Sequence, residues 1–216
     1  MELINFLETS GTFIDSRDNQ EYKWVKIGNQ IWMAENLAYL PSVNHVKPDY
    51  TNLPHYYVYG YDGTNVNEAK ANPNYAVYGV LYDWKAALSA PPPGWHLPSD
   101  AEWKQLEIDL GMTQEEVNQS ISPYYRGTDQ GTQIKTKSGW HNNGNGTNSS
   151  GFSGLPGGFY FSTGEFGFIE SFGYWWSSTE GSEFCAWNRG MGHNKSSICR
   201  NSNLKKNGFS VRCVKN

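Results

Sequence analysis

The sequence predicts an α+β domain with two or three helices, short antiparallel strands and long glycine-rich loops. Apolar residues alternate near the N-terminus, two helix-capping patterns lie mid-chain, and glycine interrupts the second half. Helices and strands in separate parts of a chain are typical of α+β proteins. No linker-like stretch divides the 216 residues, so residues 11–216 are predicted to form a single domain after an N-terminal extension, residues 1–10.

The first part of the chain is predicted to form short strands at residues 12–15, 23–27 and 30–33. Between the last two, the pair Gly28-Asn29 separates alternating apolar runs, which is a hairpin-turn signal. Residues 41–76 follow, with four prolines and many Asn and Tyr residues. Since this composition is typical of irregular structure, the segment is predicted to be a loop insertion.

Helices are predicted in the middle of the chain. One covers residues 80–88, where apolar side chains recur at helical spacing. Ser99 and Glu102 have the spacing of a capping box that begins a second helix, and Thr113 and Glu116 repeat it for a third, short one. Beyond about residue 123 the helical pattern disappears. Strands are predicted there at residues 174–178, 185–189, 196–200 and 209–214.

Charged residues are scarce in this chain and aromatic residues abundant. Charged residues make up 18%, against a usual ~25%, and aromatic residues 15%. A net charge of −4 disfavours a nucleic-acid partner, and no apolar run approaches the ~20 residues of a membrane span. The first residues lack the basic start and apolar core of a signal peptide. The composition indicates a loop-rich extracellular or binding domain.

Catalytic and metal-binding motifs are absent from the sequence. The common phosphate-binding, zinc-protease and nucleophile patterns do not occur, and five histidines are scattered without ligand spacing. Asp100 and Glu102 are interpreted as charges at a helix N-terminus, and Arg126 is expected to pair with Asp129 in a polar turn. The sequence therefore predicts a protein that is not an enzyme and needs no cofactor or metal.

The three cysteines are equally spaced, at Cys185, Cys199 and Cys213. In an antiparallel meander, Cys185 lies opposite Cys199 across a turn centred at Gly192, and Cys199 lies opposite Cys213 across a turn near Lys206. Cross-strand neighbours are close enough for a disulfide, but Cys199 can take only one partner. Three buried free thiols are an equally good interpretation.

Residues 187–203 are predicted to form the ligand-binding surface. Trp and Arg act as anchors in recognition surfaces, while Asn and Ser supply adaptable hydrogen-bonding groups. The polar residues of the segment are expected to be exposed, and the expected ligand is a protein or a glycan. For the Trp residues, core packing is an equally good interpretation. The predicted contact residues are Trp187, Asn188, Arg189, Met191, His193, Asn194, Ser196, Ser197, Arg200, Asn201 and Asn203.

A series of motifs resembles the Fibrobacter succinogenes major paralogous domain, in the order of that family. The resemblance begins at about residue 11 and reaches the end of the chain, with residues 41–76 as an insertion. The motifs are GTFIDSRD at 11–18, KIGNQIWMAENL at 26–37, YGVLYDW at 78–84, GWHLPS at 94–99, RGTD at 126–129, GFSGLPGG at 151–158, YWWSST at 174–179 and GFSVRCV at 208–214.

This resemblance implies a C-type-lectin-like fold, related to the scaffold of formylglycine-generating enzymes, in a bacterial protein of the cell surface or exterior. Family members are often supposed to act in adhesion or ligand binding. Cys213 matches the family pattern, so the resemblance favours a disulfide between the two additional residues, Cys185 and Cys199. Calcium-dependent lectins have Asp where this chain has Arg189, so calcium-mediated sugar binding is not expected.

Lectin-like domains that end in a diversified segment are targets of diversity-generating retroelements, which mutate adenines and so change Asn codons. Residues 187–203 are similar to such a segment, which makes a retroelement variable protein a hypothesis here. Two alternatives to a binding domain stay open. One is an enzyme on the related scaffold, which needs a reactive thiol or a carboxylate pair, and the other is a passive structural domain of a surface assembly.

Overall fold

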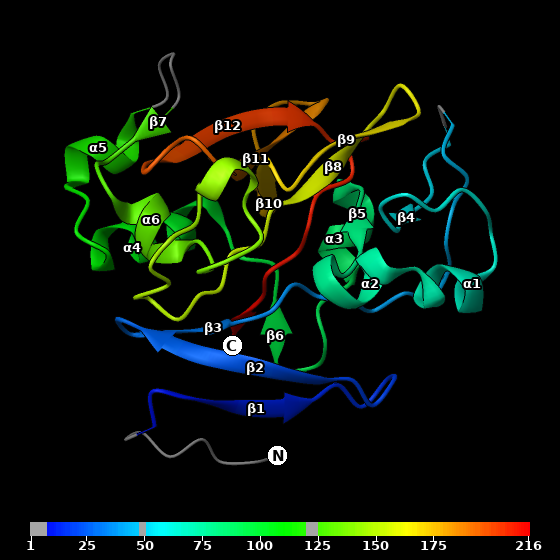
Figure 1. The fold of residues 1–216 in the computed structure, drawn as a ribbon, viewed down its shortest axis with the longest axis horizontal. Coiled ribbons are helices and arrows are strands. Elements are labelled where there is room, and N and C mark those ends of the chain that lie inside the picture. The colour runs from blue at the N-terminus through cyan, green and yellow to red at the C-terminus, as the bar shows by residue number, and fades with distance from the viewer. Residues whose placement is uncertain (1–7, 48–50, 120–124) are drawn as a thin grey trace.

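The computed structural model describes residues 8–47, 51–119 and 125–216, and the chain has the predicted α+β character. Two sheets carry the architecture, and short helices and loops pack around them (Figure 1). The described residues form six α-helices rather than two or three, of which only α4 exceeds six residues. Within these residues no helix combines the length and the apolar character needed to cross a bilayer.

The first sheet joins the two ends of the chain. Its strands are ordered β1-β2-β3-β13-β6, so the C-terminal strand pairs with β3 from the start of the chain. The predicted turn at Gly28-Asn29 is confirmed, since Ile27 pairs with Gln30 and Gly28 has a φ of +57°. The strands are β1 (Ser10–Ile14), β2 (Glu21–Ile27), β3 (Gln30–Met33), β6 (Trp95–His96) and β13 (Val214–Lys215).

The second sheet is built mainly from the glycine-rich half and has the order β7-β12-β11-β10-β8-β9. Its longest strands, β10 to β12, form an antiparallel meander, whereas the meander considered from the cysteine spacing joins the segments around Cys185, Cys199 and Cys213. A separate pair, β4 with β5, is antiparallel. The strands are β4 (Tyr56–Tyr57), β5 (Leu81–Tyr82), β7 (Tyr125–Arg126), β8 (Gly157–Phe161), β9 (Glu165–Ile169), β10 (Phe172–Glu180), β11 (Cys185–Gly192) and β12 (Ile198–Leu204).

Both predicted capping boxes are confirmed, one at Ser99 before α4 and one at Thr113 before α5. Each box satisfies free backbone N–H groups at the helix start, which explains why these two helices could be predicted locally. The helices are α1 (Val66–Ala71), α2 (Pro73–Tyr78), α3 (Trp84–Ser89), α4 (Asp100–Asp109), α5 (Gln114–Asn118) and α6 (Gln130–Ile134), with a 3₁₀ turn at His141–Asn143.

Three predicted elements differ in the structure. The helix expected from residue 80 begins at Trp84, because residues 81–82 pair with β4 and Asp83 caps the helix by accepting from the N–H of Ala86. The insertion contains β4, α1 and most of α2, and its residues 48–50 lie outside the described residues. The strand expected at 209–214 is replaced by single bridges at Phe209 and Ser210 and a short β13.

The cysteine pairing expected from the spacing is wrong in its register. The turn between β11 and β12 lies at residues 193–197, beyond Gly192, so Cys185 faces Leu204 and Cys199 faces Gly190. Cys213 is part of neither strand, and its carbonyl accepts from Met33 in the first sheet. All three thiols are free. A shift of the turn by a few residues therefore removes both predicted neighbour pairs.

Candidate ligand-binding site

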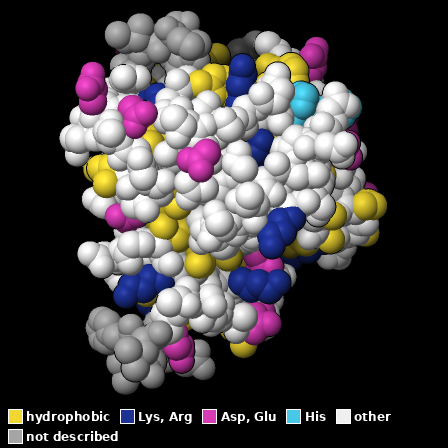
Figure 2. All heavy atoms as spheres, turned by 60° about the vertical axis from the view of Figure 1, so that its left-hand side comes forward, with side chains coloured by type: hydrophobic (Ala, Val, Ile, Leu, Met, Phe, Trp, Pro, Cys, Tyr) yellow, Lys and Arg dark blue, Asp and Glu magenta, His cyan; other side chains and the backbone are white. Residues whose placement is uncertain are grey.

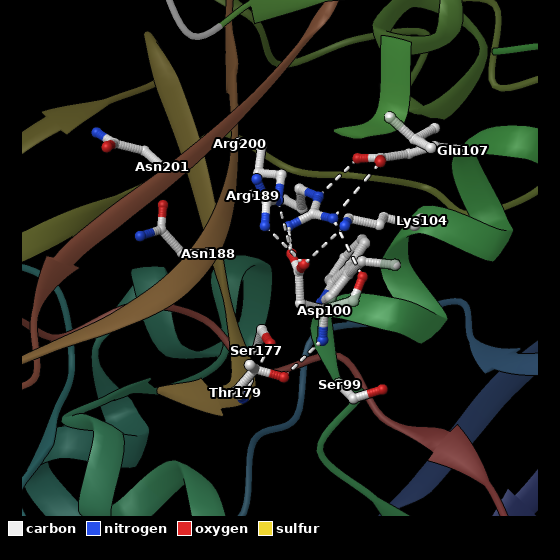
Figure 3. A network of polar contacts seen from close by, with 12 residues as sticks. Ser99, Asp100, Lys104, Glu107, Ser177, Thr179, Asn188, Arg189, Arg200 and Asn201 are labelled. Carbon is white, nitrogen blue, oxygen red and sulfur yellow. Dashed lines mark hydrogen bonds and ion pairs between the residues drawn. The ribbon is translucent and has the colours of Figure 1, made fainter. Parts of the chain in front are cut away.

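The predicted binding segment forms the hairpin of β11 and β12, and strand alternation divides it between two faces. Asn188 lies opposite Asn201, and Arg189 lies opposite Arg200. Since successive side chains of a strand point to opposite faces, the two Asn residues share one face and the two Arg residues the other. Figure 3 displays this division, with Asn188 and Asn201 on one side of the strands and the Arg pair directed toward α4.

The arginine face is closed by α4 through a network of buried ion pairs (Figure 3). Arg189 donates to Asp100 at 2.8 Å and to Glu107 at 2.6 Å. Arg200 contacts both carboxylate oxygens of Asp100, at 2.9 and 2.8 Å. On the far side, Arg126 donates to Glu107 at 2.6 Å. Two carboxylates of one helix thus hold three arginines from three strands.

The charged groups of this network are buried together and interact strongly with one another. Glu107 and Arg189 have no exposed surface, and Asp100 keeps 6%. Burial by itself would raise the pKa of Asp100, but the hydrogen bond from Arg200 and the charge of Arg189 outweigh it and lower that pKa. The pKa of Arg126 is lowered by burial and by the neighbouring arginines. Asp100 and Glu107 are therefore both occupied as counter-ions of arginines.

Four of the predicted contact residues are buried, and for the three polar ones, Asn188, Arg189 and Arg200, the expected exposure is wrong. Asn188, Arg189 and Met191 have no exposed surface, and Arg200 keeps only 7%. The composition of a recognition surface was misleading, because guanidinium groups also suit buried ion pairs. The guanidinium of Arg200 covers the half-buried ring of Trp187, with 3.7 Å from its Cζ to the ring centroid.

Arg126 also differs from its prediction. It pairs with Glu107 of α4 rather than with Asp129. Asp129 instead accepts a hydrogen bond from Gln133, one helical turn further on in α6. Likewise, Asp100 is more than a charge at a helix N-terminus, because it holds two arginines of the hairpin. Contacts across 19 residues for Arg126, and across 89 and 100 residues for Asp100, override these local interpretations.

The opposite face of the same sheet carries half-exposed aromatic rings, which we call the aromatic face. At its centre the ring of Phe159 lies 5.5 Å from that of Phe168 and 5.0 Å from that of Tyr174. The rings of Phe172 and Tyr174 lie 6.1 Å apart and only 20° from parallel. Phe168 is 51% exposed and the others are half-buried. The aromatic face consists of Phe159, Phe161, Phe168, Phe172 and Tyr174.

Glycines on adjacent strands let these rings lie flat against the sheet. A Cβ atom on Gly190 would lie 2.7 Å from Cε1 of Tyr174, closer than real Cβ contacts. A Cβ on Gly192 would lie 3.1 Å from Cε1 of Phe172, and Gly167 has the same relation to Phe161, at 2.8 Å. An aromatic ring that covers a cross-strand glycine restores packing to a position without a side chain. The rings are therefore held along the sheet surface.

Amide groups border the aromatic face. Asn201 is half-buried; its Oδ1 accepts from the N–H of Ser202, and its NH₂ group has no hydrogen-bond partner among the described residues. The buried Oδ1 of Asn188 likewise has no partner in the described part of the chain. At the other border, Oδ1 of Asn194 and the hydroxyl of Tyr125 both approach Gly192. The border thus offers donors and acceptors without net charge.

The remaining predicted contact residues lie in or near the β11–β12 turn. Asn194 and Ser196 are exposed, and His193 and Ser197 are half-buried. Lys135 fixes the turn, because its Nζ donates to the carbonyl oxygens of residues 144, 192 and 195. Asn203 is half-buried on the same side of β12 as Asn201. Of the predicted residues, Asn188, Asn194, Asn201 and Asn203 thus lie on or beside the aromatic face.

Sequence reasoning missed the aromatic face itself. Its signal was present as rings at alternate positions, 159 and 161 in β8 and 172 and 174 in β10. Alternation places such residues on one face of a strand. Alternation does not reveal whether that face is covered. Trp176, the next residue of β10 on the same face, is completely buried beside Phe209. Only the three-dimensional structure separates the open rings from the covered one.

Two of the three thiols are poorly suited to nucleophilic chemistry. Burial raises the pKa of Cys199 to about 11, and it raises that of Cys213 further. A thiol with a raised pKa is a poor nucleophile at neutral pH. No group of three or more His, Cys, Asp or Glu side chains in the described ranges could hold a metal ion.

Charge is thinly distributed over the outside of the molecule. Figure 2 shows one face on which uncharged side chains and backbone predominate, with Lys, Arg, Asp and Glu side chains scattered among them. A surface that steers a nucleic acid gathers one sign of charge. The charges on this face are therefore dispersed and of both signs.

The comparisons with known proteins identify the family. The family model of the Fibrobacter succinogenes major domain matches residues 25–215. No curated protein and no solved structure matches the chain. The match begins within β2 and covers β3 to β13, the arginine network and the aromatic face.

Proposed function

The chain belongs to the Fibrobacter succinogenes major domain family, and we propose that it is a ligand-binding domain that recognises a neutral carbohydrate on its aromatic face. The single observation that carries this proposal is the row of rings held flat against the sheet over glycines. The rings of Tyr174 over Gly190 and of Phe172 over Gly192 are the clearest cases.

Flat, half-exposed rings match the chemistry of a sugar. The electron-rich face of an aromatic ring attracts positively polarised groups, such as the C–H groups on one face of a pyranose. The near-parallel rings of Phe172 and Tyr174, 6.1 Å apart, provide a continuous platform of that kind. The ring of Tyr174 is backed by Phe209 at 5.1 Å, so it is already in place before a ligand arrives.

The amides at the border match sugar hydroxyls. An Asn side chain offers two donors and an acceptor, and a hydroxyl can pair with either kind of group. Asn201 is half-buried, and its NH₂ group has no partner among the described residues, so it can donate to a sugar hydroxyl. The lack of charged groups in this set favours a neutral sugar.

A binding role without catalysis is consistent with the state of the thiols and acids. The raised pKa of the two buried thiols argues against thiol chemistry, and Asp100 and Glu107 are occupied by arginines. We further propose, on the family resemblance, a lectin-like scaffold in a protein of the bacterial surface or exterior. Adhesion is the role that fits both proposals.

The burial of individual side chains limits the positions at which the retroelement hypothesis expects substitutions. Substitution of Asn188 would change a fully buried position, whereas Asn194 is exposed and Asn201 and Asn203 are half-buried. We therefore propose that any diversification acts on these last three positions. Population sequencing of the gene tests this, because changes at adenines of these codons, with the Arg189 and Arg200 codons constant, are the expected pattern. A uniform sequence at all of them would remove the hypothesis.

The experiment for sugar binding is a glycan array followed by calorimetry with the oligosaccharides that bind. We expect Tyr174→Ala and Phe172→Ala each to weaken binding about tenfold or more, a typical loss for an aromatic anchor. Phe184→Ala is the matched control, since Phe184 is 68% exposed and lies at the other end of β10. It should leave sugar binding unchanged.

Two outcomes would contradict the proposal. Binding that survives both substitutions on the aromatic face would place the sugar elsewhere. An array with no bound glycan, together with capture of a protein that Tyr174→Ala abolishes, would replace the carbohydrate by a protein ligand. Circular dichroism of each variant establishes that loss of binding is not loss of fold.

A further inference from the structure

A groove lies at the opposite end of β10 from Phe172. It has a volume of about 470 Å³ and opens between the insertion, α3, the β10–β11 turn and the segment after β12. This volume falls within the range of about 300–1,000 Å³ usual for ligand pockets. None of the residues of the aromatic face lines it. Its lining residues are Asn52, Leu53, Asp83, Trp84, Lys85, Leu88, Glu183, Phe184, Lys205 and Lys206.

Apolar side chains from three separate segments meet in this groove and remain exposed. Phe184 in the β10–β11 turn is 68% exposed, Leu53 of the insertion 64%, and Leu88 of α3 45%. They stand around the ring of Trp84, which is fixed below them by a hydrogen bond from its Nε1 to the carbonyl of Ser177 at 2.8 Å. Exposed apolar residues that converge in this way mark interaction sites, whereas single ones do not.

Lysines surround the apolar groups. Lys85 and Lys206 donate to the carbonyl oxygens of Asn52 and Thr51, and neither forms an ion pair among the described residues. Lys205 lies over the Trp84 ring at 4.6 Å, and it pairs with Glu180 at 2.8 Å. A carbonyl partner positions an ammonium group without neutralising it. Two of the three positive charges therefore remain available.

The border of the groove holds fewer exposed acids than lysines. Asp83 is buried, where one oxygen accepts from the N–H of Ala86 at 2.7 Å and the other lies 2.8 Å from Nδ1 of His55. Glu183 is the exposed acid of the lining, against Lys85 and Lys206, the two lysines that form no ion pair among the described residues. The border thus carries more unpaired lysines than exposed acids, on a protein whose net charge is −4. Such local charge favours partners of the opposite sign.

We propose that this groove binds an acidic segment of a partner protein, with one apolar side chain of the segment inserted between Trp84, Leu88 and Phe184. The apolar anchor would be buried against the rings, and flanking carboxylates would pair with Lys85 and Lys206. A groove with one apolar centre and a charged border is the usual layout of a peptide-binding hot spot. The site is separate from the aromatic face, so it does not depend on sugar binding.

The probe is the synthetic peptide Ac-Glu-Asp-Leu-Phe-Asp-Glu-NH₂, titrated into the full chain by calorimetry at low and at physiological salt. We expect binding that weakens as salt rises, because exposed charges are screened. Phe184→Ala should weaken it about tenfold, as should the double substitution of Lys85 and Lys206 by Gln. Lys137→Gln, at an exposed lysine far from the groove in the chain, is the matched control and should have no effect.

Any one of three results would overturn the proposal. The acidic peptide would fail to bind at millimolar concentration, a peptide with Lys in place of each acid would bind equally well, or none of the groove variants would weaken binding. A concentration-dependent dimer in sedimentation that Phe184→Ala abolishes would instead assign the groove to a second copy of this chain. Since Tyr174→Ala should leave peptide binding unchanged, failure here is distinguishable from failure of the sugar site.

Discussion

The two faces of the β11–β12 hairpin are built from similar residues, but one is covered by α4 and the other carries half-exposed side chains. One face carries Arg189 and Arg200, locked against α4 by carboxylates and with almost no exposed surface. The other carries Asn201 and, across the neighbouring glycines, the open ring of Tyr174. Asn and Arg side chains both suit recognition surfaces, so their types alone did not separate these faces.

A neighbouring element decides which polar residues of the hairpin are buried and which stay accessible. Helix α4 brings Asp100 and Glu107 to one side of the hairpin, and their charges draw the arginines inward. Beyond Trp176 and Phe209, no element among the described residues covers the other side in this way, and its rings stay half-exposed. Each face therefore predicts a different response to substitution, stability on one side and binding on the other.

The largest expected effect is on the arginine face. Glu107→Ala leaves two buried arginines, Arg126 and Arg189, without this counter-ion, and breaking a buried pair in this way costs about 3–5 kcal/mol. Urea unfolding should reveal this loss, while the folded fraction keeps its sugar affinity. Glu115→Ala, at an exposed position in the first turn of α5, is the control and should cost less than about 1 kcal/mol. Equal losses in the two variants would mean that the network is not a stabilising unit.

Low pH should reduce the stability that the arginine face contributes, by less than Glu107→Ala does. The pKa of Asp100 is lowered in the folded state, so its contribution to stability is complete above its unfolded pKa near 4 and is lost as the pH falls. Urea midpoints measured between about pH 5 and pH 2 should therefore fall, and Asp100→Asn should flatten this dependence. An unchanged slope in the variant would show that other carboxylates carry the acid response.

On the aromatic face, Gly190→Ala should have an intermediate effect. The added Cβ would displace the Tyr174 ring, and overpacking of this kind costs about 1–3 kcal/mol. Sugar affinity should fall with it, because the ring leaves its position along the sheet. Adding Tyr174→Ala should restore part of the stability and none of the affinity, which a double-mutant cycle measures. Independent, additive losses would contradict the cross-strand pairing of ring and glycine.

The smallest effect on stability is expected at Asn201. Asn201→Ala removes a half-buried side chain at the border of the aromatic face and should change the free energy of unfolding by less than about 0.5 kcal/mol. Sugar binding should nevertheless weaken about tenfold in calorimetry, because a hydrogen-bonding group to the ligand is lost. Full binding by this variant would exclude Asn201 from the site and confine recognition to the rings.

Local features of the fold were predictable from residues a few positions apart. The capping boxes at Ser99 and Thr113 and the turn at Gly28 were found in the structure where the sequence placed them. Each is stabilised by bonds within four residues, so no distant partner is needed to recognise it. Helix α6, by contrast, lacks a side-chain cap at Asp129, which explains why the sequence offered no signal for it.

The sequence by itself determined the family, the α+β class and the approximate positions of strands β10, β11 and β12. Only the tertiary structure decided the register of the β11–β12 hairpin, the burial of the arginines and the openness of the aromatic face. The reason is distance along the chain: Arg189 meets Glu107 across 82 residues and Arg200 meets Asp100 across 100. Alternation in a strand specifies that two faces exist, but the elements packed against each face decide which one meets solvent and a ligand.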